Sequence, residues 1–458
     1  MKRSRPRSSA EEARARLADN PGAMFEQVVS REEVEDYCRF VGHVWRDRLF
    51  SPLVTLWTFL GQVLDADSSC RKAVARTLNQ LWAVGRRNAS HDPSAYCRAR
   101  KRLPVALLKG LMGLIAEKLD GRVSTERLWC GRRVRLVDGT TVTMWDTPEN
   151  QARYPQPVGQ RKGCGFPMAR LVGVFSLDTG ALVDAVMGAM TDGETVLFHQ
   201  LWRMLKAGEV LVADRHYCSY AEIVLLQRLG VDVVMRLHQS RKLDMRKGKP
   251  LGPGDRLVEW ERGVRPGWMS AEDYQALPEK RVLRIVRVPL PGRTAIPVVT
   301  TLLDAVEYPA KEIARLYRRR WEIETDFDHL KTTLKMEFLL TQSPEMVEKE
   351  VWMHLLGYNL IRTLMWDAGE KQKVWALRLS LKGAVQEAMT LWPFSVRAGS
   401  KRIMKEFYEA LLKAIAFHKL PERPNRQEPR VKKRRPKGYP LMTQPRQEYR
   451  SALSGHVC

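Results

Sequence analysis

The sequence predicts an α/β protein in which a central mixed β-sheet is flanked by a helical N-terminal domain and a helical C-terminal region. Three observations lead to this prediction. Apolar residues recur at helical spacing up to about Gly121, strand-like and helical runs alternate from Arg132, and helical periodicity returns at Ala310. A chain of 458 residues is long enough for roughly two to four domains.

The first region, from about Met24 to Gly121, carries no strand signal and is expected to be helical. Pro52 is placed to open one helix. Apolar residues follow it at helical spacing: Leu53, Leu56, Trp57, Leu60 and Leu64. A basic cluster lies between Pro93 and Pro104, where it can face a phosphate backbone or form an ordinary solvated surface. The cluster consists of Arg98, Arg100, Lys101 and Arg102.

The central region begins at Arg132 with alternating strand and helix signals. In chain order we predict a strand over 134–144, a hairpin of strands 169–177 and 182–190, a helix over 194–207, a strand over 210–213, a helix over 220–229 and a strand over 231–237. Asp178, Asp184 and Asp192 are interpreted as hairpin and turn residues. Three antiparallel strands followed by helix and strand in alternation is the order of a ribonuclease-H-like, or retroviral-integrase-like, mixed sheet. Other α/β folds share this order.

The segment 238–309 is rich in Gly and Pro and contains strand-like runs at 282–289 and 296–303, so we predict a β-rich insertion. Helical periodicity then covers 310–336, 345–368 and 403–418. After Leu420 the tail contains several prolines and the run Lys432-Lys433-Arg434-Arg435. We expect this tail to be extended and exposed to solvent.

Composition narrows the class of protein. Lys and Arg number 77 against 52 acidic residues, and the net charge of +25 favours a polyanionic partner, with nucleic acid ahead of an anionic membrane or a merely basic protein. The seven cysteines form no C-x-x-C pair, so neither a zinc site nor a disulfide framework is indicated. The start, Met1 to Arg16, lacks the apolar core of a secretion signal. We expect a cytoplasmic protein with no membrane partner.

The segment from Tyr317 to Lys331 carries the clearest functional pattern. If this segment is a helix, each residue turns about 100° around the axis, and one apolar stripe results that would dock on the sheet. The stripe contains Ile313, Leu316, Ile323, Phe327, Leu330 and Leu334. A second stripe beside it holds Tyr317, Arg320, Glu324 and Lys331, which places one carboxylate among cations at the edge of the core. The alternative is an ordinary amphipathic helix with surface ion pairs.

Two further acids favour the functional interpretation. Asp138 ends the strand signal Leu136-Val137-Asp138, and Asp214 ends the run Leu211-Val212-Ala213-Asp214. Carboxylates at strand ends beside a docked helix can converge and hold Mg²⁺, which prefers oxygen ligands. Two such ions activate an attacking water or 3′-hydroxyl and stabilise the leaving oxygen. Arg320 and Lys331 would then steady the flanking phosphates, and Tyr317 could hydrogen-bond or pack there.

These residues resemble a known family. Tyr317, Arg320, Glu324 and Lys331 match Y-x2-R-x3-E-x6-K, the signature of the insertion-sequence-four family of bacterial DDE transposases. The segments Asp138-Gly139-Thr140-Thr141 and Ala213-Asp214-Arg215 resemble the family's regions around its two catalytic aspartates. The resemblance is strong over Val134 to Lys331 and looser elsewhere.

The resemblance implies that Asp138, Asp214 and Glu324 are catalytic and bind Mg²⁺, for which Mn²⁺ may substitute, with two ions per active site. It also implies cut-and-paste transposition. Double-stranded DNA at terminal inverted repeats is cleaved, and the freed 3′-hydroxyl attacks target DNA. Excision through a hairpin and a homodimeric synapse of two ends are family traits carried over in the same way.

Three other residues take part in the prediction. Trp321 resembles a family tryptophan near a flipped base, with simple packing as its alternative. Trp260 and Trp268 are both candidates for the aromatic residue of the insertion that stacks on such a base, and the sequence does not distinguish them. His216 beside Asp214 is interpreted as a supporting or structural residue, because no zinc-ligand motif accompanies it.

These predictions divide the chain into five parts: a helical DNA-binding domain (1–125), a ribonuclease-H-like catalytic core (126–237 and 310–340), a β-rich insertion (238–309), a helical C-terminal region (341–420) and a basic proline-rich tail (421–458). Two alternatives remain open. One is a metal-dependent nuclease that cuts without joining. The other is a transposase-derived DNA-binding protein that has lost catalysis.

Overall fold

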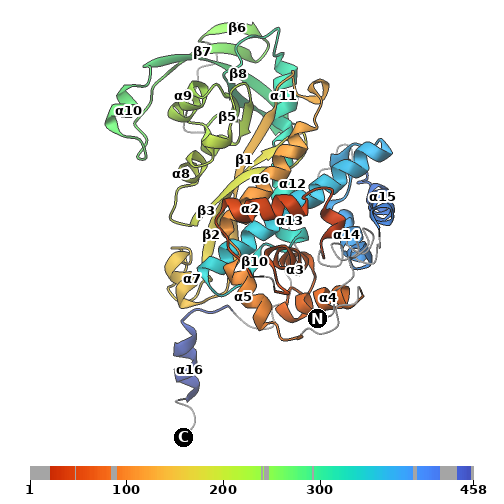
Figure 1. Ribbon diagram of the computed structural model, residues 1–458. Coiled ribbons are helices and arrows are strands. Elements are labelled where there is room, and N and C mark those ends of the chain that lie inside the picture. Colours follow the sequence, from red (N-terminus) through yellow and green to blue (C-terminus); the bar gives the residue numbers. More distant parts are fainter. Residues whose placement is uncertain are drawn as a thin grey trace.

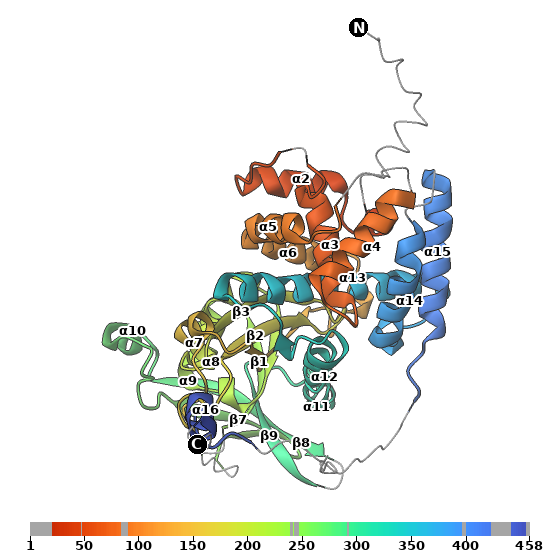
Figure 2. The ribbon, with the colours of Figure 1, turned by 90° about the horizontal axis from the view of Figure 1, so that it is seen from below.

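The computed structural model describes residues 21–46, 48–83, 90–238, 241, 247–290, 293–395, 400–422 and 441–454. A long twisted sheet forms one part of the molecule, and helices from both ends of the chain gather along one side of it (Figures 1 and 2). Within the described ranges, no helix is both long and apolar enough to cross a membrane.

The N-terminal region is helical, as predicted. Its helices are α2 (Arg31–Phe40), α3 (Pro52–Leu64), α4 (Cys70–Ala83), α5 (Ser94–Arg102) and α6 (Val105–Gly121), with short 3-10 turns at Ala23–Phe25 and Thr125–Arg127. Pro52 occupies the first turn of α3, and the Ser51 hydroxyl accepts a hydrogen bond from the Val54 amide, so both start signals act together. Every residue of α3 is buried, as expected of an apolar helix inside a core.

The sheet has the mixed topology that the sequence predicted. Its strands are β1 (Val134–Met144), β2 (Met168–Ser176), β3 (Leu182–Ala189), β4 (Val210–Ala213), β5 (Asp232–Arg236), β6 (Lys249–Gly252), β7 (Asp255–Glu261), β8 (Lys280–Leu290), β9 (Arg293–Thr300) and β10 (Phe338–Leu339). Strands β1, β2 and β3 are antiparallel, while β1, β4 and β5 are parallel. Helices α7 (Pro148–Arg153), α8 (Glu194–His199) and α9 (Tyr220–Arg228) connect the strands; α8 ends earlier than expected.

The strands of the insertion are not a separate sheet. Strand β9 pairs with β5 in antiparallel orientation, and the order β3-β2-β1-β4-β5-β9-β8-β7-β6 runs through the whole sheet. A short helix, α10 (Ala271–Gln275), interrupts the strand-rich segment. The insertion therefore lengthens the core sheet beyond β5, so that β6 rather than β5 forms this edge of the sheet.

The helix predicted over 310–336 is discontinuous, so that prediction was wrong in detail. It consists of α11 (Ala310–Arg319), α12 (Glu322–Asp328) and a π-turn over His329–Thr333. Between α11 and α12 the Arg320, Ile323 and Glu324 amides bond to carbonyls three residues back, which tightens the chain into a 3-10 turn.

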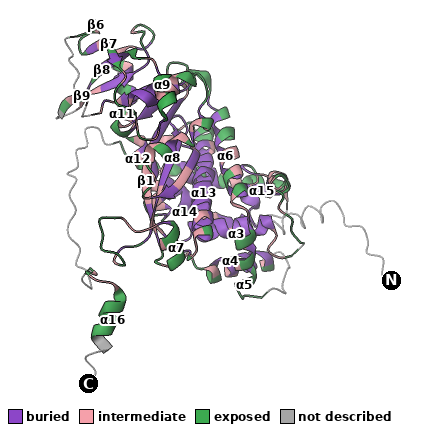
Figure 3. Cartoon of the chain, turned by 90° about the vertical axis from the view of Figure 1, so that its left-hand side faces the viewer, coloured by how far each residue is buried: buried purple, intermediate pink, exposed green. Residues whose placement is uncertain are grey.

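The C-terminal helices are α13 (Pro344–Gln372), α14 (Leu381–Ser395), α15 (Lys401–Phe417) and α16 (Arg446–Ser454). Helix α13 contacts α3 and α6 on one side and β3 on another, and Figure 3 shows it buried along most of its length. Helices α14 and α16 were not predicted. The basic run Lys432 to Arg435 lies outside the described residues, and α16 is exposed (Figure 3).

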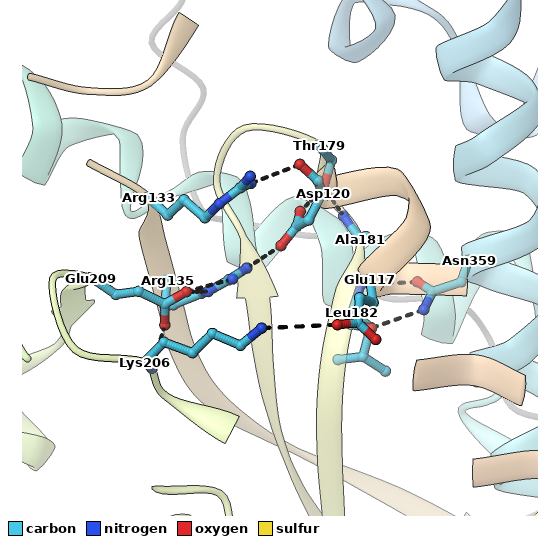
Figure 4. Close-up of polar contacts among 10 residues, drawn as sticks. All are labelled: Glu117, Asp120, Arg133, Arg135, Thr179, Ala181, Leu182, Lys206, Glu209 and Asn359. Atoms are coloured by element: carbon cyan, nitrogen blue, oxygen red, sulfur yellow. Dashed lines mark hydrogen bonds and ion pairs between the residues drawn. The ribbon is translucent and has the colours of Figure 1, made fainter. Parts of the chain in front are cut away.

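A buried ionic network joins the helical region to the sheet (Figure 4). Arg135 of β1 is 4% exposed. Its Nε and Nη2 donate to Glu209 at 2.9 and 2.6 Å, and its Nη1 donates to Asp120 of α6 at 2.5 Å. The other Asp120 oxygen accepts from the Thr179 hydroxyl at 3.1 Å. Because all three charges are paired, the network joins α6 to β1.

Candidate active site

Strand register brings Asp138 and Asp214 together. Strands β1 and β4 are parallel, with Leu136 opposite Val212. Asp138 and Asp214 each lie two residues further along, and therefore on the same face of the sheet at neighbouring positions. We predicted that Asp138 ends its strand, and this was wrong: β1 continues past it to Met144. What ends near Asp138 is the pairing between β1 and β4, whose last residue pair is Leu136 with Val212.

The same face of the sheet receives α12. Leu136 and Val212 belong to the apolar cluster that Ile323 and Phe327 of α12 also join. This docking directs α12 toward the side of β1 that carries Asp138. The apolar stripe predicted for this helix is buried as expected.

Arg320 links two of the three predicted carboxylates. Its Nη2 donates to Glu324 Oε1 at 2.7 Å, and its Nη1 lies 3.5 Å from Asp138 Oδ2. The Arg320 side chain is 16% exposed, against 23% for Asp138 and 37% for Glu324. Since the guanidinium touches carboxylates from β1 and α12 at once, it holds the two elements of the site together.

Electrostatics confirm that acids crowd this position. Burial is the main cause that raises the pKa of Asp138 to about 6, and nearby Asp214 and Glu194 raise it further, while Arg320 opposes the rise. Asp214 is partly buried, and its Oδ1 accepts a hydrogen bond from the His216 amide at 2.6 Å. The carboxylates therefore concentrate negative charge at a partly desolvated position.

The two remaining residues of the second stripe are Tyr317 and Lys331. Tyr317 is buried, hydrogen-bonds Arg320, and has its pKa raised to about 12, chiefly by burial. Lys331 is half-buried in the π-turn that follows α12. Tyr317, Arg320 and Glu324 are therefore joined by contacts of the Arg320 side chain, although the helix that carries them is interrupted.

A fourth carboxylate beside the site was not predicted. Glu194, the first residue of α8, accepts a hydrogen bond from the Tyr217 hydroxyl at 2.7 Å, and its Oε2 lies 4.0 Å from Arg170 Nε. A Cβ added at Gly139 would lie 2.6 Å from the Glu194 carboxyl carbon, so a larger residue there would require the Glu194 side chain to shift. The glycine after Asp138 is the one sequence signal that could have indicated this close approach.

The donor set suits a hard divalent cation. Asp138, Asp214 and Glu324 offer only carboxylate oxygens, the ligands that Mg²⁺ prefers, and the Arg320 guanidinium already contacts two of them as a cation would. Among the described residues, no three His, Cys, Asp or Glu side chains yet converge as ligands of one ion. Arg320 would have to move away from at least one carboxylate as an ion binds.

The predicted DNA contacts of α5 divide into two groups. Arg98, Lys101 and Arg102 are exposed. Arg100 instead turns inward: its Nη1 donates to Gln62 Oε1 at 2.9 Å, and its guanidinium lies 5.0 Å from the centre of the Phe59 ring. A surface phosphate contact by Arg100 is therefore disfavoured, because its long side chain packs in the core.

The tryptophan candidates also differ in exposure. Trp321 is 51% exposed. Trp260 is 2% exposed, with Arg241 4.0 Å from its ring centre, whereas Trp268 is half-buried against His199. Trp260 is thus a core residue, which leaves Trp268 as the more accessible of the two. His216 is exposed beside Asp214.

Comparison with known proteins gives a consistent result. The family model described as Transposase DDE domain matches residues 129–360, a span that contains all three carboxylates. Over 394 residues the chain is 27% identical to the transposase InsG for insertion sequence element IS4 of Escherichia coli, covering 84% of this chain and 86% of that protein.

Two further relatives are more distant. A probable transposase for insertion sequence element IS5377 of Geobacillus stearothermophilus is 24% identical, covering 76% of this chain and 85% of the relative. A transposase for insertion sequence element IS421 of Escherichia coli is 25% identical, and the match covers 75% of this chain and 93% of the relative. A cryo-EM structure of a piggyBac transposase synaptic complex with hairpin DNA covers 89% of this chain and 87% of its own at 9% identity and a TM-score of 0.44, a likeness too loose to support an argument.

Proposed function

Since this chain belongs to the Transposase DDE domain family and is a bacterial DDE transposase of the insertion-sequence-four type, we propose that Asp138, Asp214 and Glu324 are the three carboxylates of its DNA-cleaving and strand-transferring site. Membership of this family means that the activity of the protein is DNA transposition. The proposal concerns which residues carry that activity and how they do so.

One observation supports the proposal above the others. The Arg320 guanidinium contacts both Asp138 and Glu324, which are separated by most of the catalytic region in sequence. Asp214 joins them because the β1–β4 register sets it beside Asp138. Three acids and one arginine on one face of the sheet, at its interior strands β1 and β4, suit phosphodiester chemistry, which uses metal ligands together with a cation for phosphate.

Family members use divalent metal ions, and we propose Mg²⁺, replaceable by Mn²⁺, as a pair held by the three carboxylates. Such ions would activate the attacking water or 3′-hydroxyl and stabilise the leaving oxygen. Arg320 and Lys331 would bind phosphates on either side of the scissile bond. Tyr317 would hold Arg320 in position, because its hydroxyl bonds that side chain.

We further propose that the DNA partners are the terminal inverted repeats of a mobile element and a target duplex, joined by a cut-and-paste route in a homodimer within the bacterial cytoplasm, at the nucleoid. Residues 1–125 would bind the element ends, with Arg98, Lys101 and Arg102 among the contacts, and 238–309 would act as the insertion that reaches the ends. Residues 126–237 and 310–340 would form the catalytic core.

The test uses DNA that flanks the coding region, in which inverted repeats bracketed by short duplications are expected. With this DNA as donor, the unmodified protein should give cleaved ends and joined products. Asp138→Ala, Asp214→Ala and Glu324→Ala should each abolish both products while DNA binding stays within about threefold, because the acids bind metal rather than phosphate.

The outcomes separate the candidate functions. Cleavage without joined products would favour a nuclease, and binding without cleavage by the unmodified protein would favour a transposase-derived DNA-binding protein. Normal cleavage by any one of the three variants would remove that residue from the site.

A further inference from the structure

Helix α12, which carries Glu324, is short and lies between two irregular turns. It spans Glu322–Asp328, with the 3-10 turn at Arg320 before it and the π-turn His329–Thr333 after it. The α-helical pattern of hydrogen bonds is therefore interrupted at both ends. Because α11 does not continue into α12 as one regular helix, side-chain contacts of α12 must contribute to the orientation of Glu324.

Two arginines contact α12 from opposite sides. Asp326 follows Glu324 by two residues, which places it about 200° further around the helix. Arg320 donates to Glu324 on the side of the proposed metal ligands. On the other side, Arg362 of α13 donates from Nη2 to Asp326 Oδ1. The Arg362 and Asp326 side chains are 4% and 8% exposed, so this second ion pair is enclosed in the protein.

Arg362 also connects α12 to the sheet. Its Nε donates to the Tyr358 hydroxyl at 2.9 Å, and that hydroxyl donates to the Gly180 carbonyl at 2.7 Å. Gly180 lies in the turn between β2 and β3 with a φ of +69°, and a Cβ there would lie 3.1 Å from Arg362 Cζ. Both the backbone conformation and the close approach of the guanidinium favour glycine at this turn.

The π-turn after α12 reaches the same guanidinium. His329 Nδ1 lies 3.3 Å from Arg362 Nη2. Burial is the main cause that lowers the pKa of His329 to about 4, so its ring is neutral near pH 7 and can accept this hydrogen bond. Arg362 thus contacts α12, the π-turn and, through Tyr358, the β2–β3 turn. Strand β2 pairs directly with β1 beside Asp138.

The two arginines differ in what metal binding would do to them. Arg320 bonds Glu324 and lies beside Asp138, and it must leave at least one of them when these carboxylates hold an ion. Arg362 and Asp326 lie on the opposite side of α12, so their ion pair can persist through that exchange. After Arg320 has moved, this pair still ties α12 to α13 and the sheet.

We propose that Arg362 and Asp326 are positioning residues for DNA cleavage: they hold α12 in the orientation that directs Glu324 at the metal ions. The inference rests on the proposed function, because it takes Glu324 to be a metal ligand. A buried ion pair contributes little net stability compared with apolar side chains of the same volume. Its hydrogen bonds are directional, however, and direction is what a metal ligand on a short helix needs.

The first experiment compares Asp326→Asn with Asp255→Asn in the full-length protein. Asp255 pairs with Arg284 through bonds of 2.8 and 2.6 Å, and those side chains are 5% and 0% exposed. Both substitutions keep the side-chain shape and remove one charge of a buried pair, so both should lower the melting temperature. The pair of Asp255 and Arg284 lies in the insertion and does not contact α12, which makes it the matched control.

Only Asp326→Asn should change the metal requirement. The Mg²⁺ concentration for half-maximal single-turnover cleavage, at saturating DNA, should rise roughly tenfold or more, as it does when a group that orients a metal ligand is removed. Affinity for DNA in EDTA should be unchanged. Asp255→Asn should cleave with the Mg²⁺ dependence of the unmodified protein.

A second readout needs neither metal nor cleavage. Amide hydrogen exchange in EDTA measures local opening of α12. Weakening a charged hydrogen bond to this helix should speed exchange at residues 322–328 about tenfold in Asp326→Asn, while Asp255→Asn leaves it unchanged.

A third variant separates positioning from stability. Asp326→Leu combined with Arg362→Met replaces the ion pair by apolar side chains of similar volume, so the melting temperature should stay the same or rise. Apolar contacts are not directional, and the Mg²⁺ requirement should still rise roughly tenfold. If the pair had a purely structural role, this stable variant would cleave with normal Mg²⁺ dependence. The same variant decides the question if Asp326→Asn does not fold.

Normal Mg²⁺ dependence in the double variant, or equal α12 exchange in Asp326→Asn and Asp255→Asn, would overturn the inference. Failure of the proposed function looks different. If Glu324→Ala cleaves DNA normally, the catalytic assignment fails, although the exchange rates still report whether the ion pair holds α12. If Glu324→Ala abolishes cleavage while the Asp326 and Arg362 variants match the control, only the positioning role fails.

Discussion

At the scale of single residues, Arg320 is the contact on which the proposed site depends. It reaches carboxylates on β1 and α12 with two different nitrogens. Lysine has one compact ammonium group and cannot reproduce this fork. Arg320→Lys should therefore lose about one charge-assisted hydrogen bond to a phosphate beside the scissile bond, about 1.5–3 kcal/mol, and slow cleavage roughly tenfold or more.

The matched control for Arg320 is Arg318→Lys, at an exposed position of α11 two residues earlier in the chain. Single-turnover cleavage rates with saturating DNA compare the two variants directly. Equal rates for Arg320→Lys and the unmodified protein would show that the guanidinium fork has no part in catalysis.

Asp178 gives a prediction about pH. The residue is 3% exposed, and its Oδ2 finds no hydrogen-bond partner in the described part of the chain. Burial raises its pKa from 3.8 to about 6. The folded protein thus binds this proton more tightly than the unfolded chain, so Asp178 should lower the free energy of unfolding by about 3 kcal/mol as pH rises from about 4 to 6.

Asp178→Asn removes that titration, and its stability relative to the unmodified protein should increase over the same pH interval. Urea denaturation at several pH values measures the difference, with the exposed Asp146→Asn as control. A constant difference between Asp178→Asn and the unmodified protein from pH 4 to 7 would contradict the assignment.

At the scale of elements, the contact between α6 and β1 depends on a buried ion network. Arg135→Met leaves the Asp120 and Glu209 carboxylates buried without their cation, which should destabilise the fold by about 3–5 kcal/mol. Arg402→Met removes an exposed pair with Glu406 and should cost less than about 1 kcal/mol. Chemical denaturation compares the two variants, and similar small losses in both would contradict a joining role for Arg135.

Local patterns predicted some elements closely and failed at others. Strands β1 and β4 begin and end where predicted, because β4 is a continuous apolar run and β1 is rich in Val and Thr. The break in the helix at Arg320 was missed because it does not disturb the apolar pattern. Despite the tightened turn at Arg320 and the π-turn at His329–Thr333, Ile323, Phe327 and Leu330 are all buried. Apolar periodicity records which side is buried, not which hydrogen bonds are made.

The candidate site was predictable for the same reason, and only in part. Asp138, Asp214 and Glu324 follow local strand and helix patterns that the chain displays directly. Glu194 reaches Gly139 from a distant helix, and Arg100 turns inward because Gln62 lies beside it in space. Apart from Gly139 itself, neither contact has a local signature, so the periodicity of the chain could not reveal it.

At the scale of the whole molecule, the sheet passes from the core into the insertion without interruption. The strands of 238–309 were predicted, but their pairing with β5 through β9 was not, because strand partners distant in sequence leave no local pattern. The continuous sheet gives the insertion a rigid connection to the strands that carry Asp138 and Asp214.

The net charge of +25 leads to a prediction about DNA affinity. Contacts between Lys or Arg and phosphates release counterions, so the logarithm of the association constant should fall linearly with the logarithm of salt concentration. Fluorescence anisotropy with duplex DNA over a range of salt concentrations measures the slope. A flat response would exclude an extensive interface with the DNA backbone.

The most direct test of the central claim is to map the metal position with Fe²⁺ in place of Mg²⁺, which generates hydroxyl radicals that cut the polypeptide near the bound ion. We predict cuts close to Asp138, Asp214 and Glu324 together, suppressed by excess Mg²⁺ and lost as a group in Asp138→Ala. Cuts near only one of these residues, or a pattern that Asp138→Ala leaves intact, would contradict a shared metal site.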